Sequence, residues 1–494
     1  MASQDHPTPT PADKPELSRL EKLHRIEQLG IDPWGGRFDG AMPIGQIRQL
    51  PAKPLSEADL PLVRAAGRIV GRRDQGKLYF LDLWDQTGKI QVLLGQKQIG
   101  ELGWKLAELL DLGDLIGIDG HFGTTRRGEL SIQASSLTML AKSLEPHPTG
   151  YYGMEDVEFR LRHRYLDLIY TPQTLQRAHQ RIKIVRTIRN YLDERGFVEA
   201  ETPTLHAIAG GAAARPFTTH HNALGIDLFL RIALELHLKR LLVGGIERVY
   251  EIGRVFRNEG ISPRHNPEFT MLELYQAYGD YRTMMDLTEG IIVACADALG
   301  GGRCLQWGDR EVNLEPPFQR ASYAELFERH VGIRMDQTDQ LAATAQAHGI
   351  APAGKHPDVL IHELFEACVE EALVGPVFVY DYPASLCPLT RRKRDNPALA
   401  ERFELYIHGL ELANAYTELN DPITQEATFR SQLAGLPEEE SMAKMDEDFV
   451  RALRHGMPPA GGLGIGIDRL TMLLTNTQSI RDVILFPLLR PGKH

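Results

Sequence analysis

Between residues 62 and 140 the chain alternates apolar and polar side chains in short runs that end at glycine-containing turns. Such a period of two is typical of β-strands with one buried face. The runs are VRAAGRIVG, KLYFLDLWD, KIQVLLG, DLIGIDGHFG and ELSIQASSLTML. A helical stretch from Ile99 to Leu110 separates the third run from the fourth. Short strands with one inserted helix predict a small, closed Greek-key barrel.

This predicted barrel carries side chains that suit a nucleic acid strand. Small five-stranded barrels of the oligonucleotide-binding (OB) type bind bases on aromatic side chains and phosphates on basic ones. Tyr79 and Phe80 lie in the second predicted strand, and Arg72 and Arg73 precede it. An aromatic residue in a strand is otherwise part of the core. The alternation alone therefore favours a core position for a single phenylalanine such as Phe80.

The rest of the chain predicts one helix before the barrel and a larger domain after it. Residues 15–29 have the pattern of a short helix that ends at Gly30, and EPHPTGYYG, residues 145–153, has the composition of a linker. Beyond the linker, helices and strands mix without regular βαβ alternation, which predicts an α+β fold whose antiparallel sheet is flanked by helices. The expected division is a disordered tail at 1–15, the helix and barrel at 16–145, a linker at 146–155 and a large domain at 156–494, with surface loop and helix in the acidic stretch 437–448.

Composition restricts the expected cellular location of the protein and the kind of contact it can make with nucleic acid. Of its 494 residues, 43% are hydrophobic and 24% are charged, and no apolar stretch approaches the roughly 18–20 residues of a membrane span. The four cysteines form no C-x-x-C pair, so we expect reduced thiols. The N-terminal residues lack the pattern of a signal or transit peptide, which predicts a cytoplasmic location. The net charge of −11 predicts that any contact with nucleic acid is local.

Candidate chemistry is concentrated in RVYEIGRVFRNEGISPRHNPEFTMLELYQAYGDY, residues 248–281, which has the pattern of strand, loop and strand. Alternation predicts that one face of this hairpin carries Glu251, Gly253, Val255 and Arg257 from the first strand and Phe269, Met271, Glu273 and Tyr275 from the second. Arginine binds phosphate or carboxylate, phenylalanine can cover a base, and glutamate can bind an ammonium group. This face therefore suits a nucleotide together with an amino acid, whereas a solvated surface hairpin explains Phe, Gly and Arg on one face poorly.

A second candidate segment is GGLGIGIDRLTMLLTN, residues 461–476. Alternating glycines at 462, 464 and 466 leave one face of a predicted strand bare, so that another group can approach the backbone. Asp468 and Arg469 then begin a helix. A helix N-terminus with an arginine suits polyphosphate, although the segment is not a P-loop.

A third segment is ERFELYIHGLELANAYTELND, residues 401–421. His408 and Gly409 predict a turn between two strands. Alternation then places Asn414, Tyr416 and Glu418 on one face, and Glu404 and Glu411 add carboxylates that could hold Mg²⁺ against the phosphates of ATP. Seen in isolation, such carboxylates are more often surface residues.

In these segments the chain resembles the class II aminoacyl-tRNA synthetases. Residues 254–259 with 264–269 resemble motif 2, GLGIGIDRL resembles motif 3, and the predicted helix 175–195 with GFVEAETPTL resembles motif 1, which builds the dimer interface of that class. GGAAARPF, THHNALGIDLFLRIALELHLKRL, RNEGISPRHNPEFTMLE and IRDVILFPLLRP are similar to the lysine-specific enzymes. The resemblance runs from about residue 16 to the C-terminus. It implies a homodimer that acts on ATP, L-lysine and tRNA(Lys), with several Mg²⁺ ions accompanying ATP.

The resemblance also implies roles for individual residues. Arg257 and Arg469 would be catalytic, binding the α-phosphate with the lysine carboxylate and the γ-phosphate, respectively. The other residues implied are Glu259, His265, Asn266 and Phe269 for ATP; Glu404 and Glu411 for Mg²⁺; Gly211 and Glu235 for the α-amine of lysine; Glu418, Tyr275 and Glu273 for its ε-ammonium; Asn414 for its carboxylate; Tyr416 for its side chain; and Phe80, Gln91, Glu129 and Arg72 for the anticodon.

Two positions depart from the family pattern, and three rival functions can be weighed against it. Tyr416 is commonly Phe, and Leu234 stands where Pro is common, which concerns the shape of the loop before Glu235. A lysyl transferase that acts on a protein would resemble the second domain alone, without the barrel. A non-catalytic tRNA-binding paralogue would be expected to lack Arg257, Arg469 or a metal carboxylate. A synthetase for aspartate would need a basic side-chain pocket instead of a carboxylate-rich one.

Overall fold

The computed structural model describes residues 17–146, 154–208, 210–212, 214–434 and 446–491. The chain divides into two compact units, one ending at Asp156 and the other beginning at Val157. The predicted tail, most of the predicted linker and most of the acidic stretch 437–448 lie outside the described residues.

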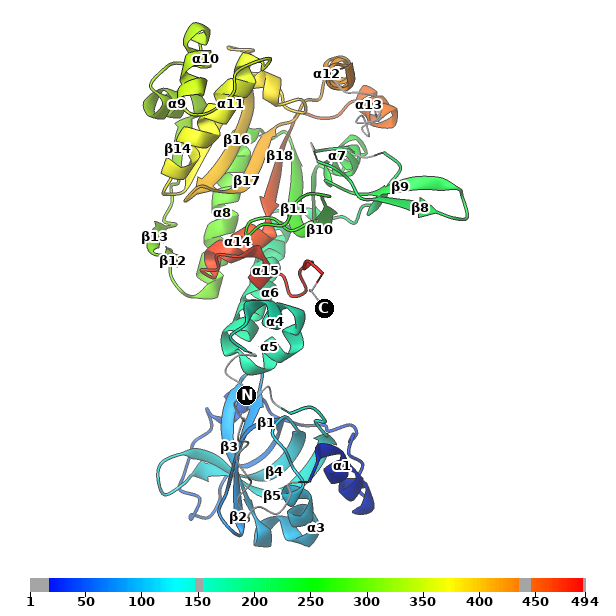
Figure 1. Ribbon diagram of the computed structural model, residues 1–494, viewed down its shortest axis with the longest axis vertical. Helices are drawn as coiled ribbons and strands as arrows, with labels where there is room; N and C mark the ends of the chain where they lie inside the picture. The colour runs from blue at the N-terminus through cyan, green and yellow to red at the C-terminus, as the bar shows by residue number, and fades with distance from the viewer. Residues whose placement is uncertain (1–16, 147–153, 209, 213, 435–445, 492–494) are drawn as a thin grey trace, which may run out of the picture. The chain divides into compact units, whose positions relative to one another are not determined.

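The first unit is a closed five-stranded barrel, which confirms the fold predicted for this part of the chain. Its strands follow one another in the order β1-β2-β3-β5-β4 (Figure 1). Their bounds are Leu62–Asp74, Leu78–Asp85, Gly88–Gly95, Leu115–Thr124 and Leu130–Ala141 for β1 to β5, with helices α1 Arg19–Gln28, α2 Ile44–Ile47 and α3 Gln96–Glu108. Alternate side chains of the strands, such as Leu81, Leu83, Val92 and Ile118, fill the core. The predicted periodicity thus sorts core from surface.

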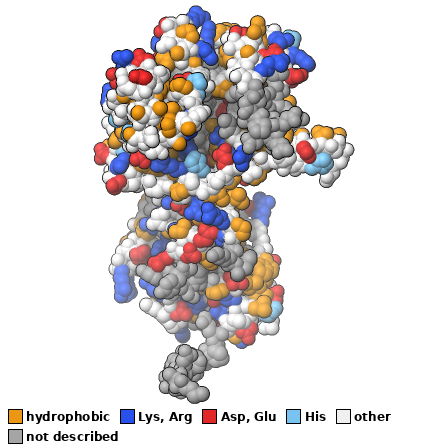
Figure 2. Space-filling model, turned by 45° about the horizontal axis from the view of Figure 1, so that its top comes forward, with side chains coloured by type: hydrophobic (Ala, Val, Ile, Leu, Met, Phe, Trp, Pro, Cys, Tyr) orange, Lys and Arg blue, Asp and Glu red, His pale blue; other side chains and the backbone are white. Residues whose placement is uncertain are grey.

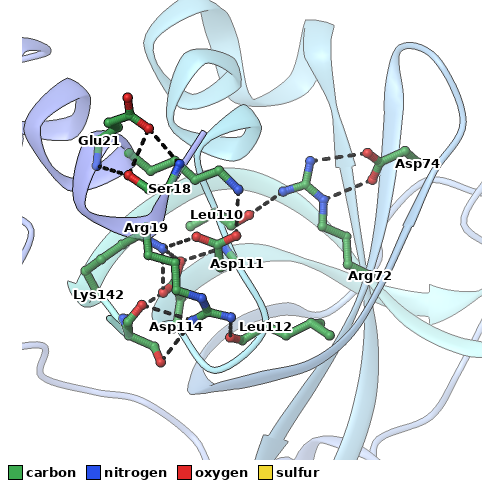
Figure 3. Close-up of polar contacts among 12 residues, drawn as sticks. Ser18, Arg19, Glu21, Arg72, Asp74, Leu110, Asp111, Leu112, Asp114 and Lys142 are labelled. Atoms are coloured by element: carbon green, nitrogen blue, oxygen red, sulfur yellow. Dashed lines mark hydrogen bonds and ion pairs between the residues drawn. The ribbon is translucent and has the colours of Figure 1, made fainter. Parts of the chain in front are cut away.

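A cluster of buried ion pairs lies between α1 and the barrel (Figure 3). The side chain of Lys142 is fully buried, and its Nζ lies 2.6 Å from Asp111 and 2.9 Å from Asp114. Lys22 from α1 reaches the same Asp111 at 2.7 Å. Since buried charges need partners, this cluster fixes the loop before β4 against the end of β5.

The second unit is built on an eight-stranded sheet of order β14-β15-β16-β17-β18-β11-β10-β6, with parallel pairing only at β14–β15 and β10–β6. The bounds of these strands are β6 Val198–Glu199, β10 Arg248–Phe256, β11 Glu268–Ala277, β14 Gln319–Ser322, β15 Val377–Pro383, β16 Leu399–Ile407, β17 Leu410–Thr417 and β18 Ala460–Gly466. Helices α6 Pro172–Asp193 and α8 Tyr281–Leu299 cover one face, where Ile184, Ile291, Leu272 and Ile465 share the largest core (Figure 1). This confirms the predicted α+β fold and leaves the opposite face for a site.

Smaller elements surround the sheet. They are α4 Val157–Arg162, α5 Arg164–Tyr170, β7 Leu205–His206, β8 Thr218–His221, β9 Ile226–Leu230, α7 Glu235–Val243, β12 Cys304–Trp307, β13 Arg310–Asn313, α9 Tyr323–Val331, α10 Thr338–Ala347, α11 Pro357–Cys368, α12 Pro422–Ala434, α13 Glu447–Arg454, α14 Ile467–Leu474 and α15 Ile480–Val483. Acidic and basic side chains are interspersed over the face seen in Figure 2. Among the described residues, no helix is both long and apolar enough for a membrane span.

Candidate active site

The candidate residues of the three sequence segments meet on one face of the sheet. In the β10–β11 hairpin, Glu251 pairs with Glu273 and Val255 with Phe269, as the predicted alternation requires. Strand β18 continues this face, because Gly462 lies opposite both Tyr275 of β11 and Tyr416 of β17. Three segments that are distant in the sequence therefore build one surface.

The nucleotide part of this surface centres on Arg257, just beyond the end of β10. The centre of its guanidinium group lies 5.2 Å from the ring centroid of Phe269. Its buried Nε has no hydrogen-bond partner among the described residues. The Phe269 ring is only partly buried. A guanidinium donor and an aromatic face are thus both available to a ligand.

Arg469, in the first turn of α14, joins two of the predicted segments. Its Nη1 donates to the carbonyl of Glu411 at 2.8 Å and to the carboxylate of Glu411 at 3.1 Å. Its Nη2 lies 3.2 Å from Nε2 of His265 in the loop of the hairpin. Partial desolvation and the charge of Arg469 lower the pKa of His265, so its neutral ring can accept this hydrogen bond. The structure therefore places His265 beside the predicted phosphate ligand.

The neighbour of Arg469 ties the site to the covered side of the sheet. Asp468 accepts hydrogen bonds from Arg181 of α6 at 2.5 Å and from the backbone N–H of Thr270 at 2.7 Å. In the loop between β10 and β11, Asn266 is buried and its amide donates to the carbonyl of Glu268 at 2.7 Å. Glu259, in the same loop, is exposed. Asn266 thus shapes the loop from within, and Glu259 lies on its outer side.

Carboxylates gather between Arg469 and the outer strands. Tyr382 and Tyr406 donate to Glu404 at 2.8 and 2.5 Å, and Arg402 forms an ion pair with it. Burial would raise the pKa of Glu404, but Arg402 and the two hydroxyl groups outweigh that effect and keep it below its usual value. Burial raises the pKa of Glu370 to about 7, and the charges of Glu404 and Glu411 add to this rise.

Three buried carboxylates, those of Glu235, Glu273 and Glu418, lie on the adjacent part of this face, and we refer to their surroundings as the acidic pocket. Glu235, at the start of α7, accepts from Tyr416 at 2.8 Å and from Lys239 at 2.5 Å. Glu418, just after β17, is fully buried and forms an ion pair with the same Lys239. Burial raises the pKa of Glu418 to about 8 against the opposing effect of Lys239, and burial raises that of Glu273 to about 7. Carboxylates with such raised pKa values favour a cationic ligand beside them.

The backbone around Glu235 shows how the loop departs from the family pattern. The N–H of Leu234 donates to Glu273 at 3.0 Å, and Tyr275 donates to the other oxygen of Glu273 at 3.2 Å. A proline at 234 would lack this N–H. Gly211 has a φ of +88°, and a Cβ on it would lie 3.7 Å from that of Glu235. Gly211 and Glu235 are therefore neighbours, as the resemblance implied.

In the barrel, the structure brings together only some of the predicted anticodon residues. Phe80 and Gln91 lie on the outer face of β2 and β3, and Gln91 accepts from Ser131 at 3.0 Å. The guanidinium of Arg73, not Arg72, lies over the ring of Phe80, at 5.7 Å. Arg72 instead contacts Asp74 and the carbonyl of Leu110 (Figure 3). Its guanidinium also lies over the ring of Tyr79.

Glu129 is the remaining residue predicted to bind the anticodon. Its side chain is exposed, and its carbonyl accepts from Ser131 at 3.2 Å, so it lies close to Gln91 through a shared partner. Phe80 is only partly buried, which favours a surface role for its ring over a core role. The structure therefore gathers Phe80, Gln91 and Glu129 with Arg73 and leaves Arg72 in internal contacts.

Two basic residues of the site, Lys239 and Arg402, were not among the residues predicted from the sequence. Lys239 binds Glu235 and Glu418, and Arg402 binds Glu404 while also donating to Asn414 at 3.1 Å. The spacing of Lys239 from Glu235 is that of an i,i+4 helix pair, which was visible in ELHLK. Such pairs are usually exposed, so the spacing alone does not distinguish a buried pair in a pocket.

We predict that Gly462→Ala raises the KM for the amino acid substrate at least about tenfold. A Cβ at this position would lie 1.9 Å from a carboxylate oxygen of Glu418 and 2.6 Å from the ring of Tyr275. Gly464→Ala is the matched control, because the tightest contact of its Cβ would be with the flexible end of Met271, at 3.2 Å, and Asn414 and Glu273 would lie at ordinary contact distances of 3.8 and 4.0 Å. Steady-state kinetics of both variants check the prediction, and equal KM values in the two would contradict it.

The family matches agree with this geometry. Residues 156–490 match the family described as tRNA synthetases class II (D, K and N), and residues 63–140 match the OB-fold nucleic acid binding domain. The site thus lies within a class II synthetase domain.

Similar proteins extend the match to nearly the whole chain. Proteins called lysine--tRNA ligase in Moorella thermoacetica, Carboxydothermus hydrogenoformans and Bacillus cereus are 50%, 49% and 46% identical to it, over 96% of this chain and 97% of each relative. The chain therefore belongs to the class II tRNA synthetases and, within them, to the family of these lysine--tRNA ligases, which confirms the resemblance.

Proposed function

We propose that this protein activates L-lysine with ATP to lysyl-adenylate and then transfers the lysyl group to the 3′ end of tRNA(Lys). The observation that carries the proposal is the junction of two half-sites on one face of the sheet. Arg257 and Phe269 offer a guanidinium and an aromatic ring, and beside them Glu235, Glu273 and Glu418 form a buried acidic pocket. The first half-site suits a nucleotide, and the second suits a substrate with two amino groups.

In the first step, the carboxylate of lysine attacks the α-phosphorus of ATP, and pyrophosphate leaves. Neither reactant needs a covalent bond to the protein, so the protein contributes alignment and neutralisation of negative charge. Arg257 would contact the α-phosphate and the attacking carboxylate, where charge accumulates. Arg469 would bind the γ-phosphate, with His265 holding its guanidinium and Phe269 stacking on adenine. The terminal hydroxyl of tRNA then attacks the lysyl-adenylate.

Glu404 and Glu411 would hold Mg²⁺ together with the phosphates. Their carboxylates suit this hard cation. Burial raises the pKa of nearby Glu370, and the negative charges of Glu404 and Glu411 add to that rise. No three His, Cys, Asp or Glu side chains of the described chain are grouped so as to bind a metal without further ligands. Phosphate oxygens would complete the set. Bound ions would supply positive charge that neutralises the triphosphate, and Arg469, which contacts Glu411, would be available to a phosphate once a metal ion occupied that carboxylate.

In the acidic pocket, Glu235 with Gly211 would bind the α-amine, and Glu418 with Tyr275 and Glu273 would bind the ε-ammonium group. Asn414 would contact the substrate carboxylate, and Tyr416 would line the side-chain channel. An amino acid without a terminal cation would leave Glu418 buried without its ligand, at a cost of about 2–5 kcal/mol. This cost supports selection of lysine over neutral amino acids.

ATP–pyrophosphate exchange measured with each of the twenty amino acids tests the proposal. We expect exchange with lysine to exceed that with any other amino acid by at least about tenfold. Charging of tRNA(Lys) transcripts then tests the second step. Exchange with aspartate, or its absence with every amino acid, would contradict the first step. Exchange without charging would favour a lysyl transferase that acts on another acceptor.

The barrel would read the anticodon of tRNA(Lys) with Phe80, Gln91 and Glu129, and Arg73, whose guanidinium lies over the ring of Phe80, would take the place expected for Arg72. We predict that Phe80→Ala raises the KM for tRNA about tenfold and leaves ATP–pyrophosphate exchange unchanged, because loss of one stacked base costs about 1–3 kcal/mol. Phe38→Ala is the control, since Phe38 also has an arginine, Arg64, over its ring, at 4.1 Å. Equal tRNA KM values in the two variants would count against a role in anticodon binding.

The same proposal includes the assembly and location of the protein. Helix α6, which corresponds to motif 1, would form the interface of a homodimer in the cytoplasm. The contact of Arg181 on this helix with Asp468, next to Arg469, would connect that interface to the ATP site. Sedimentation velocity tests the dimer directly, and a monomer at micromolar concentration would contradict it.

A further inference from the structure

We infer that Lys239 is a resident cation of the lysine pocket, a positioning residue that bridges Glu235 and Glu418 and balances the charge of the pocket so that each of these carboxylates can receive one amino group of the substrate. The inference rests on the proposed function, because it concerns how the same pocket recognises lysine. It adds a residue that touches neither ATP nor, in the proposed arrangement, lysine itself.

Lys239 lies on helix α7 and faces the end of strand β17, which Glu418 directly follows. On α7, Lys239 lies one turn after Glu235 and donates to it at 2.5 Å. Across the pocket, the same Nζ forms an ion pair with Glu418. The Nζ also lies 5.6 Å from the ring centroid of Tyr416, which itself donates to Glu235. One ammonium group therefore bridges the two carboxylates proposed for the α-amine and the ε-ammonium.

The charges of the pocket match lysine only if Lys239 is included. Three carboxylates, those of Glu235, Glu273 and Glu418, face one ammonium group, which leaves two negative charges when all are ionised. Lysine brings two ammonium groups, and its carboxylate is left to Arg257. Without Lys239, one negative charge would remain unpaired in a buried site, where a carboxylate takes up a proton instead.

The directions of the pKa shifts agree with this charge balance. Burial raises the pKa of Glu418, and Lys239 is the group that opposes this rise, whereas Glu235 and Glu273 reinforce it. The hydroxyls of Tyr275 and Tyr416 also face this cluster, and burial raises their pKa values well above the usual range, so both stay protonated. The guanidinium of Arg257 faces Glu273 and opposes the rise in its pKa that burial causes. Removal of Lys239 would therefore raise the pKa of Glu418 further above neutral pH, so that an ammonium group would bind there less readily.

A purely structural role would not require an ammonium group here. The side chain of Lys239 is fully buried, and a methionine would occupy similar volume without the cost of desolvating a charge. The ion pairs with two carboxylates of the pocket explain why this buried side chain carries a positive charge, whereas packing alone does not.

Lys239→Met tests the inference, with Lys142→Met as the matched control. Lys142 is equally buried and also bridges two carboxylates, Asp111 and Asp114, but it lies in the barrel (Figure 3). We expect Lys239→Met to raise the KM for lysine at least about tenfold at pH 7, with the KM for ATP unchanged. Since Glu418 must lose its proton to bind an ammonium group, the deficit should shrink to about threefold at pH 9. Lys142→Met should leave the KM for lysine unchanged at both pH values.

A measurement on the wild-type protein keeps the inference testable if Lys239→Met does not fold. Calorimetric titration of lysine in buffers of different ionisation enthalpy gives the protons released on binding. The charge balance requires all three carboxylates to be ionised in the complex, so Glu418, whose pKa is about 8, and Glu273, whose pKa is about 7, should together release about one to two protons per site at pH 7 and fewer at pH 9. Absence of proton release at pH 7 would overturn the inference, as would a pH-independent KM deficit in Lys239→Met.

The two proposals fail differently. If the wild-type protein neither binds lysine nor supports lysine-dependent exchange, the proposed function is wrong. If it does both, but Lys239→Met has a normal KM for lysine at pH 7, only the role of Lys239 is wrong.

Discussion

Replacement of Arg257 by alanine is expected to abolish lysine-dependent ATP–pyrophosphate exchange, with a loss of kcat of at least about a hundredfold. The guanidinium of Arg257 lies over the ring of Phe269, and its buried Nε has no partner in the described part of the chain, so this donor is free for the reacting groups. A positive charge at the α-phosphate stabilises the transition state more than the ground state, because negative charge increases there during attack. Lysine binding alone, measured by calorimetry, should weaken less than kcat falls.

Arg254→Ala is the matched control for this experiment. Arg254 lies on the same hairpin, but its side chain is 43% exposed and lies 3.6 Å from Glu268 in a surface ion pair. Surface pairs of this kind contribute about 0–1 kcal/mol, so both folding and exchange should persist. Exchange that survives in Arg257→Ala at the rate of this control would rule out the proposed role of Arg257.

We expect Glu418→Gln to raise the KM for lysine at least tenfold, which corresponds to about 1.4 kcal/mol. Glutamine keeps the shape of the side chain but removes the charge that would meet the ε-ammonium and that also pairs with Lys239. Because that charge also excludes neutral amino acids, discrimination against neutral analogues of similar length should fall as well. Steady-state exchange kinetics with lysine and with such an analogue measure both effects.

The corresponding control is Glu426→Gln. Glu426 also accepts from two basic side chains, Arg430 at 2.8 Å and Arg454 at 2.6 Å, but those partners are exposed on α12 and α13. Its replacement should leave the KM for lysine unchanged. Near-normal lysine activation by Glu418→Gln, equal to that of Glu426→Gln, would contradict the assignment of the ε-ammonium site.

Much of the fold was predictable because its strands have one buried and one open face. The period of two in residues 62–140 identified the barrel strands, and the helix α3 begins only three residues before the predicted Ile99. The same period predicted that Arg257, Phe269 and Glu273 share a surface, and the register of β10 with β11 follows it. The roles of individual residues came from the resemblance, since spacing does not identify a ligand.

The sequence by itself determined which side chains of each strand share a face, because alternation is a local property of an extended backbone. Only the tertiary structure decided which faces meet. It brought Lys239 from a helix to Glu418 after β17, set Arg402 between Glu404 and Asn414, and placed Arg73 rather than Arg72 over Phe80. The contacts of Arg402 and Arg73 lie within one strand or between neighbouring strands, and there side-chain packing decides which partner is contacted. The contact of Lys239 with Glu418 depends on packing between segments far apart in the chain, and burial there turns an ordinary surface ion pair into part of a binding pocket.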